Sequence, residues 1–226
     1  MPEYKFKRVT LFAGHYGSGK TNIAVNFALK MREKGLSVKI ADLDIVNPYF
    51  RTKDSAERLN KADIELISPA FANTNVDLPA LPQEVYKLVQ RKDFNAVFDI
   101  GGDDRGAYAL GRYVPAILEE NDYEMVFVAN FYRPLTRTAE DALTVMREIE
   151  EACKIKFTAI VNNSNLGNLT TAKDVENTLG EAQQLSEITN LPLIFTTAVK
   201  GVAENLSVDN LFEITLQEKY FDIKEN

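Results

Sequence analysis

The stretch that decides the fold is a strand-like run, a glycine-rich loop and the start of a helical pattern. It reads Arg8-Val9-Thr10-Leu11-Phe12-Ala13-Gly14-His15-Tyr16-Gly17-Ser18-Gly19-Lys20-Thr21. Its segment from Gly14 to Thr21 matches the phosphate-loop pattern G-x-x-x-x-G-K-[ST], the Walker A motif, in full. From Thr21 to Lys34 apolar residues recur at helical spacing, and Gly35 predicts the end of that helix. The order strand, loop, helix predicts a phosphate-binding turn in an α/β domain.

The residue types in this loop suit phosphate chemistry. Glycines let the backbone fold so that its N–H groups point inward at phosphate oxygens, and the helix N-terminus adds positive charge. The Lys20 ammonium can reach the β- and γ-phosphates, and the Thr21 hydroxyl can bind Mg²⁺. The predicted nucleotide-binding residues in the loop are Gly14, His15, Gly17, Ser18, Gly19, Lys20 and Thr21.

Short β-rich runs alternate with helical segments along the whole chain. The expected strands are Arg8–Phe12, Ser37–Ala41, Ile64–Ile67, Ala96–Ile100, Met125–Ala129, Phe157–Val161 and Leu193–Thr197. The expected helices are Thr21–Lys34, Gln83–Arg91, Ala107–Glu120, Arg137–Ala152, Thr171–Thr189 and Asn210–Phe221. Such βαβ units predict one three-layer α/β/α domain over residues 1–226, with a mainly parallel central sheet of about seven strands. The irregular stretch Ser68–Pro82 is either a functional loop or a packed surface loop.

Composition excludes several classes of protein. The chain has 226 residues and a net charge of 26 − 33 = −7, which disfavours a nucleic-acid-binding surface. Its one cysteine, Cys153, excludes a disulfide framework, although it could meet its mate across a dimer. We see no apolar run suited to a signal peptide or to a membrane span of ~18 residues, so we expect a cytoplasmic protein with no membrane partner.

Three carboxylates lie where ligands of α/β proteins bind. Asp99 follows an apolar strand, so it is expected at the carboxyl edge of the sheet, where it can hold Mg²⁺. Asp42 and Asp44 stand two residues apart and begin on the same side of an extended segment. The alternative is that these two aspartates hydrogen-bond to backbone groups in a turn or cap a helix.

The motifs together resemble the deviant Walker A loop of the MinD/ParA superfamily (the SIMIBI class of nucleotide-binding proteins). The pattern Gly14-x-x-Gly17-x-Gly19-Lys20-Thr21 carries the resemblance, with Asp42-Leu43-Asp44 as the D-x-D switch and Asp99-Ile100-Gly101-Gly102 as Walker B and switch II. The stretch Asp44–Arg51 then takes the place of switch I.

That resemblance implies binding and slow hydrolysis of Mg·ATP, coupled to a protein partner. It implies that Lys20 and Asp44 are catalytic, with Asp44 orienting the attacking water, and that Thr21, Asp42 and Asp99 hold the metal. Two alternatives remain open. One is an ATP-dependent biosynthetic enzyme resembling dethiobiotin synthetase or the cobyrinate amidases, and the other is a sensor that binds nucleotide without hydrolysing it.

The expected base is adenine. Guanine is usually recognised by the carboxylate of an N-K-x-D motif, whereas Asn165 stands here three residues after Asn162. A neutral amide does not supply the two strong acceptors that guanine requires. In the resembling ATPases an Asn at the end of this strand contacts adenine, which makes Asn162 a nucleotide-binding candidate for ATP and ADP, with turn chemistry as its alternative.

Two further expectations concern partners. His15 stands where the relatives have a signature lysine that crosses a nucleotide-bound homodimer, so it is either a substitute for that lysine or a loop histidine without a partner. Arg51, Arg105 and Arg133 follow strands or switches and could meet phosphate across such a dimer. The acidic segment Asn210–Phe221 is expected to be a helix packed on the domain, because anionic lipid would repel it.

Overall fold

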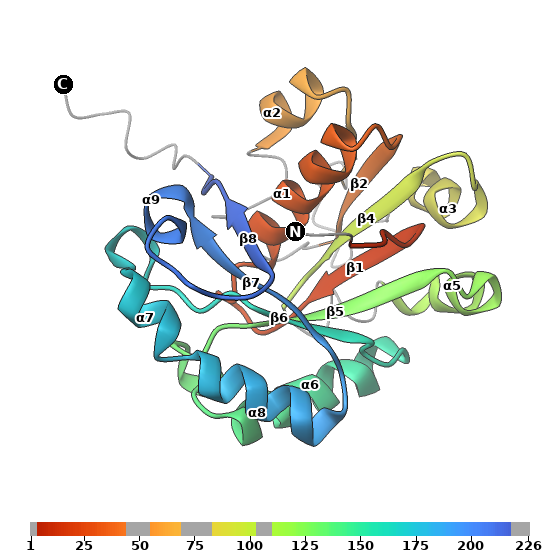
Figure 1. Cartoon of the computed structure of the whole chain (residues 1–226). Coiled ribbons are helices and arrows are strands. Elements are labelled where there is room, and N and C mark those ends of the chain that lie inside the picture. Colours follow the sequence, from red (N-terminus) through yellow and green to blue (C-terminus); the bar gives the residue numbers. More distant parts are fainter. Residues whose placement is uncertain (1–3, 44–54, 69–82, 103–109, 218–226) are drawn as a thin grey trace, which may run out of the picture.

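A computed structural model describes residues 4–43, 55–68, 83–102 and 110–217 of the chain. The strands in these ranges form one sheet of eight, in the order β3-β2-β4-β1-β5-β6-β7-β8 (Figure 1). Every neighbouring pair is parallel. The strands are β1 Val9–Ala13, β2 Val38–Leu43, β3 Glu65–Ile67, β4 Asn95–Ile100, β5 Tyr123–Ala129, β6 Ala159–Asn162, β7 Leu193–Val199 and β8 Leu211–Ile214.

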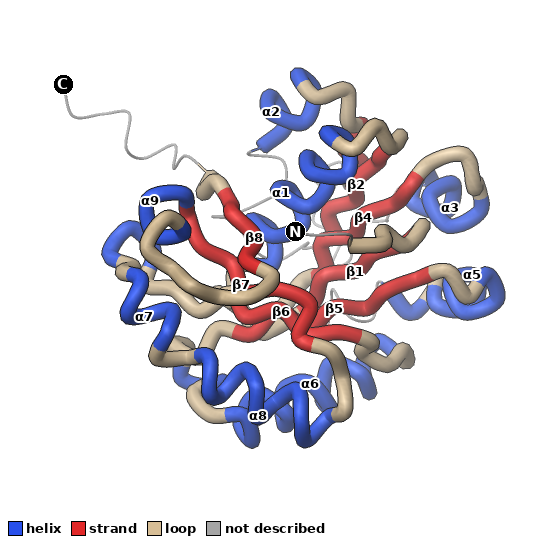
Figure 2. The backbone as a smooth tube through the Cα atoms, viewed as in Figure 1, coloured by secondary structure: helices blue, strands red, loops and turns tan. Residues whose placement is uncertain are grey.

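Helices cover both faces of this sheet (Figure 2). One face carries α1 Lys20–Glu33 and α2 Ala56–Lys61, which pack into one apolar cluster with the sheet. The other face carries α3 Gln83–Gln90, α5 Val114–Glu120, α6 Ala139–Cys153 and α8 Leu179–Thr189, which pack into a second cluster. The described ranges also contain two short α-helices, α7 Ala172–Glu176 and α9 Lys200–Ala203, and two 3-10 helices, Pro134–Thr136 and Gly167–Leu169. The predicted three-layer α/β/α architecture is confirmed.

The central strand shows why the sheet lies between two layers. All of β1 is buried, with Leu11 and Ala13 in the cluster of α3, α5, α6 and α8, and Phe12 in the cluster of α1 and α2. Strands that are apolar on both sides suit a parallel sheet covered on both faces. Since parallel strands all end at the same edge, the loops after β1, β4, β5, β6 and β7 gather there.

The predicted helix at Asn210–Phe221 is wrong over its described part. Residues Leu211–Ile214 form β8, which pairs in parallel with β7. Phe212 and Ile214 are buried whereas Glu213 is exposed, the period of two that a strand requires. The apolar residues at 212 and 216 also fit helical spacing, and only pairing with β7 decides between the two. Residues 218–226 lie outside the described ranges.

Two other helices differ from expectation. The predicted single helix Thr171–Thr189 is interrupted after α7, where the Thr178 hydroxyl donates to the Val175 carbonyl (2.8 Å) and receives a hydrogen bond from Asn162. Ile188, which the helical pattern placed on the apolar face, is 46% exposed. The expected helix Ala107–Glu120 begins its main body at Val114 with Pro115 in the first turn, as proline prefers.

None of the helices in the described ranges combines the length and the apolar character needed to cross a lipid bilayer.

Candidate nucleotide-binding site

The loop between β1 and α1 folds into a tight turn that ends at the helix N-terminus. Gly17 and Gly19 take left-handed conformations with φ of 77° and 86°, and the Ser18 N–H donates to the His15 carbonyl (3.0 Å). Gly19 is the N-cap of α1, and no side chain caps the helix there. The first N–H groups of a helix have no partner within the helix, so an uncapped start offers them to an anion.

Two side chains from neighbouring loops hold carbonyl groups of this turn. The Arg133 Nε donates to the Gly17 carbonyl (2.8 Å), and the Asn163 Nδ2 donates to the Ser18 carbonyl (2.6 Å). These two contacts fix the conformation of the turn, and a turn of this kind can present backbone N–H groups to an anion. Arg133, considered above as a contact across a dimer, therefore supports the loop of its own chain.

Both ends of the Asn163 side-chain amide form hydrogen bonds, and this side chain leaves no room for a Cβ at position 19 of the loop. Its Oδ1 accepts a hydrogen bond from the Thr197 hydroxyl of β7. A Cβ added to Gly19 would lie 2.3 Å from the Asn163 Nδ2, a distance that no side chain tolerates. Sequence reasoning missed Asn163 and Thr197 because their partners are distant in the chain.

The polar residues at the start of α1 are buried at the loop. Lys20, Thr21 and Ser18 are all buried. Within the described ranges the buried Ser18 Oγ has no hydrogen-bond partner, and such a group in a native fold usually indicates a ligand, water or ion. The residues present therefore fit a bound phosphate.

Gly102, which follows β4, lies against the same loop. A Cβ at Gly102 would lie 2.9 Å from the Tyr16 backbone nitrogen and 3.0 Å from the Lys20 Nζ. A side chain at Gly102 would thus fill the space beside the lysine ammonium. The bare backbone keeps that space open.

Two of the three predicted carboxylates are brought together. Asp42 of β2 and Asp99 of β4 are register neighbours, and both are buried at the carboxyl edge of the sheet. Asp44 lies outside the described residues, as do Arg51, Arg105 and most of the stretch Ser68–Pro82.

A metal ion at this edge would need ligands beyond the two carboxylates. Within the described ranges no group of three or more His, Cys, Asp or Glu residues could hold a metal ion. Mg²⁺ commonly keeps several waters and binds through one or two carboxylates plus substrate phosphates. Asp42, Asp99 and the Thr21 hydroxyl fit that pattern.

The asparagines at the end of β6 and in the loop after it are engaged in hydrogen bonds with this loop and with Thr178. Asn162 is fully buried, and its Nδ2 donates to the Thr178 hydroxyl (3.1 Å) while its Oδ1 accepts from the Ser164 N–H (3.1 Å). Asn165 donates to the Asn163 carbonyl (2.7 Å) and accepts from the Gly167 N–H (3.1 Å). The contact of Asn162 with a base stays a prediction, and it requires these buried bonds to open.

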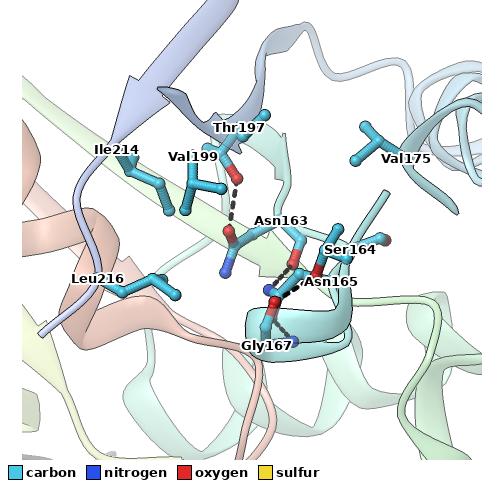
Figure 3. Close-up of a pocket in the computed structure, with 11 residues that line it drawn as sticks. Asn163, Ser164, Asn165, Gly167, Val175, Thr197, Val199, Ile214 and Leu216 are labelled. Atoms are coloured by element: carbon cyan, nitrogen blue, oxygen red, sulfur yellow. Dashed lines mark hydrogen bonds between the residues drawn. The ribbon is translucent and has the colours of Figure 1, made fainter. Parts of the chain in front are cut away.

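A pocket lies beside the phosphate loop at the ends of β6, β7 and β8 (Figure 3). Its cavity volume is about 20 Å³, which is room for about one water molecule and far below the ~300–1,000 Å³ typical of ligand pockets. Its lining is part polar and part apolar: Asn163, Ser164, Asn165, Gly167, Thr170, Val175, Thr197, Ala198, Val199, Ile214 and Leu216. Because Asn163 also binds the Ser18 carbonyl, the pocket and the phosphate loop are directly connected.

His15 and Cys153 bear on the expectation of a dimer. The His15 Nδ1 lies 2.9 Å from the Tyr16 carbonyl oxygen, so the ring folds against its own loop, while Tyr16 is 55% exposed. Cys153 is buried, and burial raises the pKa of its thiol to about 12. The thiol is therefore not available at the surface to meet its mate in a second chain.

The sheet order, the phosphate loop and the flanking helices define an α/β domain with the P-loop NTPase fold. Solved structures similar to this chain include the chloroplast FtsY of Physcomitrella patens, at 17% identity and a TM-score of 0.59 over 89% of this chain and 62% of that one. The FtsY of Thermotoga maritima is similar at 17% identity and a TM-score of 0.56, over 88% of this chain and 63% of that one.

The signal recognition particle receptor FtsY of Elizabethkingia anophelis, solved in complex with GDP, is similar at 14% identity and a TM-score of 0.53. That match covers 86% of this chain and 58% of the other, so the chain spans about three fifths of the length of these proteins. No family model and no curated protein sequence matches this chain.

Proposed function

We propose that the chain binds a magnesium nucleoside triphosphate at the loop Gly14–Thr21 and hydrolyses it slowly, as a switch that acts on a protein partner. One observation carries the proposal: the uncapped glycine loop, the buried Lys20 and Thr21, and the paired Asp42 and Asp99 all meet at one edge of the sheet. Each group has a role in binding a charged phosphate chain.

Each residue of the candidate site has a separate role in the proposed hydrolysis. The Lys20 ammonium and the loop N–H groups would stabilise negative charge on the phosphates. Thr21, Asp42 and Asp99 would hold Mg²⁺, which when bound neutralises phosphate charge. Asp44, by resemblance, would orient the attacking water.

The similar solved structures support nucleotide binding by analogy of fold. One of them is a complex with GDP. A fold hosts many functions, so this likeness supports the proposal without deciding the nucleotide or the partner.

We expect ATP and ADP rather than guanine nucleotides. The Asn165 Oδ1 already accepts the Gly167 N–H, and a neutral amide there lacks the two acceptors that a guanine-binding carboxylate offers. Because one similar structure is a complex with GDP, the choice between adenine and guanine should be tested early. Calorimetry should show tighter binding of ATP or ADP than of GTP or GDP. Equal or tighter binding of guanine nucleotides would contradict this part.

A nucleotide-dependent homodimer is part of the same proposal. If His15 replaces the signature lysine, the ATP-bound protein should dimerise more readily than the ADP-bound protein, and His15→Ala should reduce the difference. Sedimentation with a slowly hydrolysed ATP analogue measures this. A monomer with every nucleotide would remove His15 from the mechanism.

The experiment that tests the proposed hydrolysis is phosphate release from Mg·ATP by the purified chain without other metabolites. We expect slow release, and we expect Asp44→Asn to bind Mg·ATP but to release phosphate roughly 100-fold more slowly, as general-base losses do. Asp209→Asn, at an exposed residue before β8, is the matched control and should match wild type.

Two outcomes would contradict the switch. Phosphate release that appears only with a small carboxylic acid indicates the biosynthetic alternative, and tight ATP binding with no release indicates a sensor. Unchanged release by Asp44→Asn would leave the switch in place but transfer the water-orienting role to another residue.

A further inference from the structure

A groove lies between helices α1 and α2, away from the phosphate loop. Its volume is about 440 Å³, within the ~300–1,000 Å³ typical of ligand pockets. The last turns of the two helices supply its lining: Leu29, Arg32, Glu33, Arg58, Lys61 and Ala62. Lys20 and Arg32 stand twelve residues apart in α1, about 18 Å along the axis at ~1.5 Å per residue, so the groove is separate from the phosphate loop.

Arg32 joins the two helices beside the groove. Its Nε donates to the Ala62 carbonyl at the end of α2 (3.0 Å), and its Nη2 donates to the Asp63 carboxylate (2.7 Å). The two helices accordingly lie next to each other (Figure 1). Positions 29, 32 and 33 share one face of α1, and positions 58, 61 and 62 share one face of α2, because residues three and four apart are neighbours on a helix. The groove is thus formed by two helix faces that are bonded together.

Most charges around the groove are neutralised in pairs. Three ion pairs account for them: Arg32 with Asp63 (2.7 Å), Lys61 with Glu57 (2.6 Å) and Lys30 with Glu33 (2.7 Å). Arg58 is the exception. Within the described ranges no ion pair or hydrogen bond engages its guanidinium, and its buried Nη1 has no partner. With Arg58 the set holds four cations and three carboxylates, which leaves a net charge of +1.

A guanidinium in this state favours an anionic ligand. A buried charged donor without an acceptor is unfavourable, and such a group in a native fold usually indicates a water, an ion or a ligand. Because the Arg58 guanidinium has already lost part of its hydration, an anion that binds it has less water to displace. Its planar fork matches the two oxygens of a carboxylate.

The rest of the lining narrows the class of ligand. The net charge of +1 matches one carboxylate better than a phosphate group, which carries up to two charges at neutral pH. Leu29 and Ala62 are partly buried against the apolar cluster of α1 and line the groove. They offer an apolar surface beside the unpaired guanidinium.

We propose that the groove between α1 and α2 binds a small organic monocarboxylate, with its carboxylate on Arg58 and its apolar part on Leu29 and Ala62. This inference does not depend on the proposed function, because none of the lining residues belongs to the phosphate loop or to the carboxylates at positions 42 and 99.

The test is an NMR titration of the isotope-labelled full chain with hexanoate, hexanamide, acetate and inorganic phosphate. Hexanoate should shift the backbone signals of the groove residues and saturate, whereas hexanamide, which has the same shape without the charge, should not. Hexanoate should bind more tightly than acetate, by about fourfold for each CH₂ that the groove buries. Inorganic phosphate should bind more weakly than hexanoate.

Variants assign the binding to the groove. Arg58→Gln should weaken hexanoate binding by roughly tenfold or more, the scale of a charge-assisted hydrogen bond. Leu29→Ala should weaken hexanoate but not acetate. Arg137→Gln, at an exposed arginine before α6, is the matched control and should bind hexanoate like wild type. Circular dichroism checks the fold of each variant, and if Arg58→Gln does not fold, the comparison of hexanoate with hexanamide on wild type decides.

The contrary outcomes are distinct. Equal binding of hexanoate and hexanamide would overturn the role of the charge, and so would wild-type hexanoate affinity in a folded Arg58→Gln. Shifts that spread over the surface without saturation would overturn the site itself. Tighter binding of inorganic phosphate than of hexanoate would overturn the choice of a carboxylate. Mg·ATP affinity should be the same in Arg58→Gln and wild type, so a failure here leaves the proposed function unaffected.

Discussion

The two ends of the candidate site are built in different ways. The phosphate end comes from one continuous stretch, Gly14–Thr21, whose function depends on backbone conformation. The small pocket beside it is lined by the loop after β6, by α7, by the end of β7 and by Ile214 and Leu216 at the end of β8. Its lining residue Asn163 bonds to Ser18, 145 positions away in the sequence. A site formed by the backbone of one continuous segment can therefore be recognised from the sequence. A pocket lined by side chains from several segments depends on the whole fold.

The largest expected effect comes from a side chain added to the phosphate end. Gly19→Ala forces a left-handed residue and a Cβ 2.3 Å from the Asn163 Nδ2. The loop must then move, and we expect Mg·ATP affinity to fall by roughly 100-fold or more, the scale at which two charge-assisted hydrogen bonds are lost. Calorimetry measures the loss.

A second glycine provides the control for that variant. Gly180 lies in α8, where an added Cβ meets nothing within 4 Å. Gly180→Ala should keep ATP affinity and raise the free energy of unfolding by about 0.5–1 kcal/mol. Wild-type affinity in Gly19→Ala would show that the loop conformation is not needed for binding.

A smaller effect is expected from the metal. Removing Mg²⁺ with a chelator should weaken ATP binding by about tenfold, because the two carboxylates then face the phosphates without a cation between them. Asp99→Asn should reduce this dependence on Mg²⁺ in the same titration. Identical affinities with and without Mg²⁺ would remove Asp42 and Asp99 from the site.

The strands that surround the phosphate loop could be predicted from sequence because their signals are local. The loop, β1 and α1 follow one another, and burial on both faces gives β1 and β5 continuous apolar runs. The carboxylates at 42 and 99 could be placed for the same reason, since each ends an apolar strand.

The rest could not be predicted because long-range partners decide it. Residues 211–214 fit a helix as well as a strand until β7 pairs with them. Asn163 matters through Ser18 and Thr197, and nothing within its own segment marks it. Asn22 and Asn26 of α1 bind the backbone of Gln217 and Thr215, which are far away in the sequence.

The smallest expected effect on binding comes from the amino edge of the sheet, away from both ends of the site. Glu124 of β5 is the register neighbour of Thr10, and within the described ranges its buried Oε2 has no hydrogen-bond partner. Burial raises the pKa of this carboxyl from 4.5 to about 7. The folded state therefore holds a proton that the unfolded chain releases, so the contribution of Glu124 to stability is full below pH ~4.5 and is lost as the pH rises through 7.

Glu124→Gln removes this titration. The free energy of unfolding of wild type should fall by up to about 3 kcal/mol between pH 4.5 and 7 relative to the variant. Chemical denaturation at several pH values measures it, and ATP affinity at a fixed pH should not change. Parallel pH profiles for the two proteins would contradict the assignment.

Glu150 provides a contrast of opposite sign. Burial alone would raise the pKa of its carboxyl, but hydrogen bonds from Lys156, Arg147 and the Phe157 N–H outweigh burial and lower it. Its contribution is present above its ordinary pKa and is lost as the pH falls through the lowered value. Glu150→Gln should therefore change the acid side of the stability profile and leave the region near pH 7 unchanged.

The central claim is that Gly14–Thr21 binds the phosphates of a nucleotide, and calorimetric titration of Mg·ATP into wild type and Lys20→Ala tests it most directly. We expect one ATP per chain for wild type and a roughly 10- to 150-fold weaker affinity for Lys20→Ala, the cost of losing hydrogen bonds between charged groups. Circular dichroism should show that the variant keeps the wild-type fold. No binding by wild type, or the same affinity in a folded Lys20→Ala, would contradict the account.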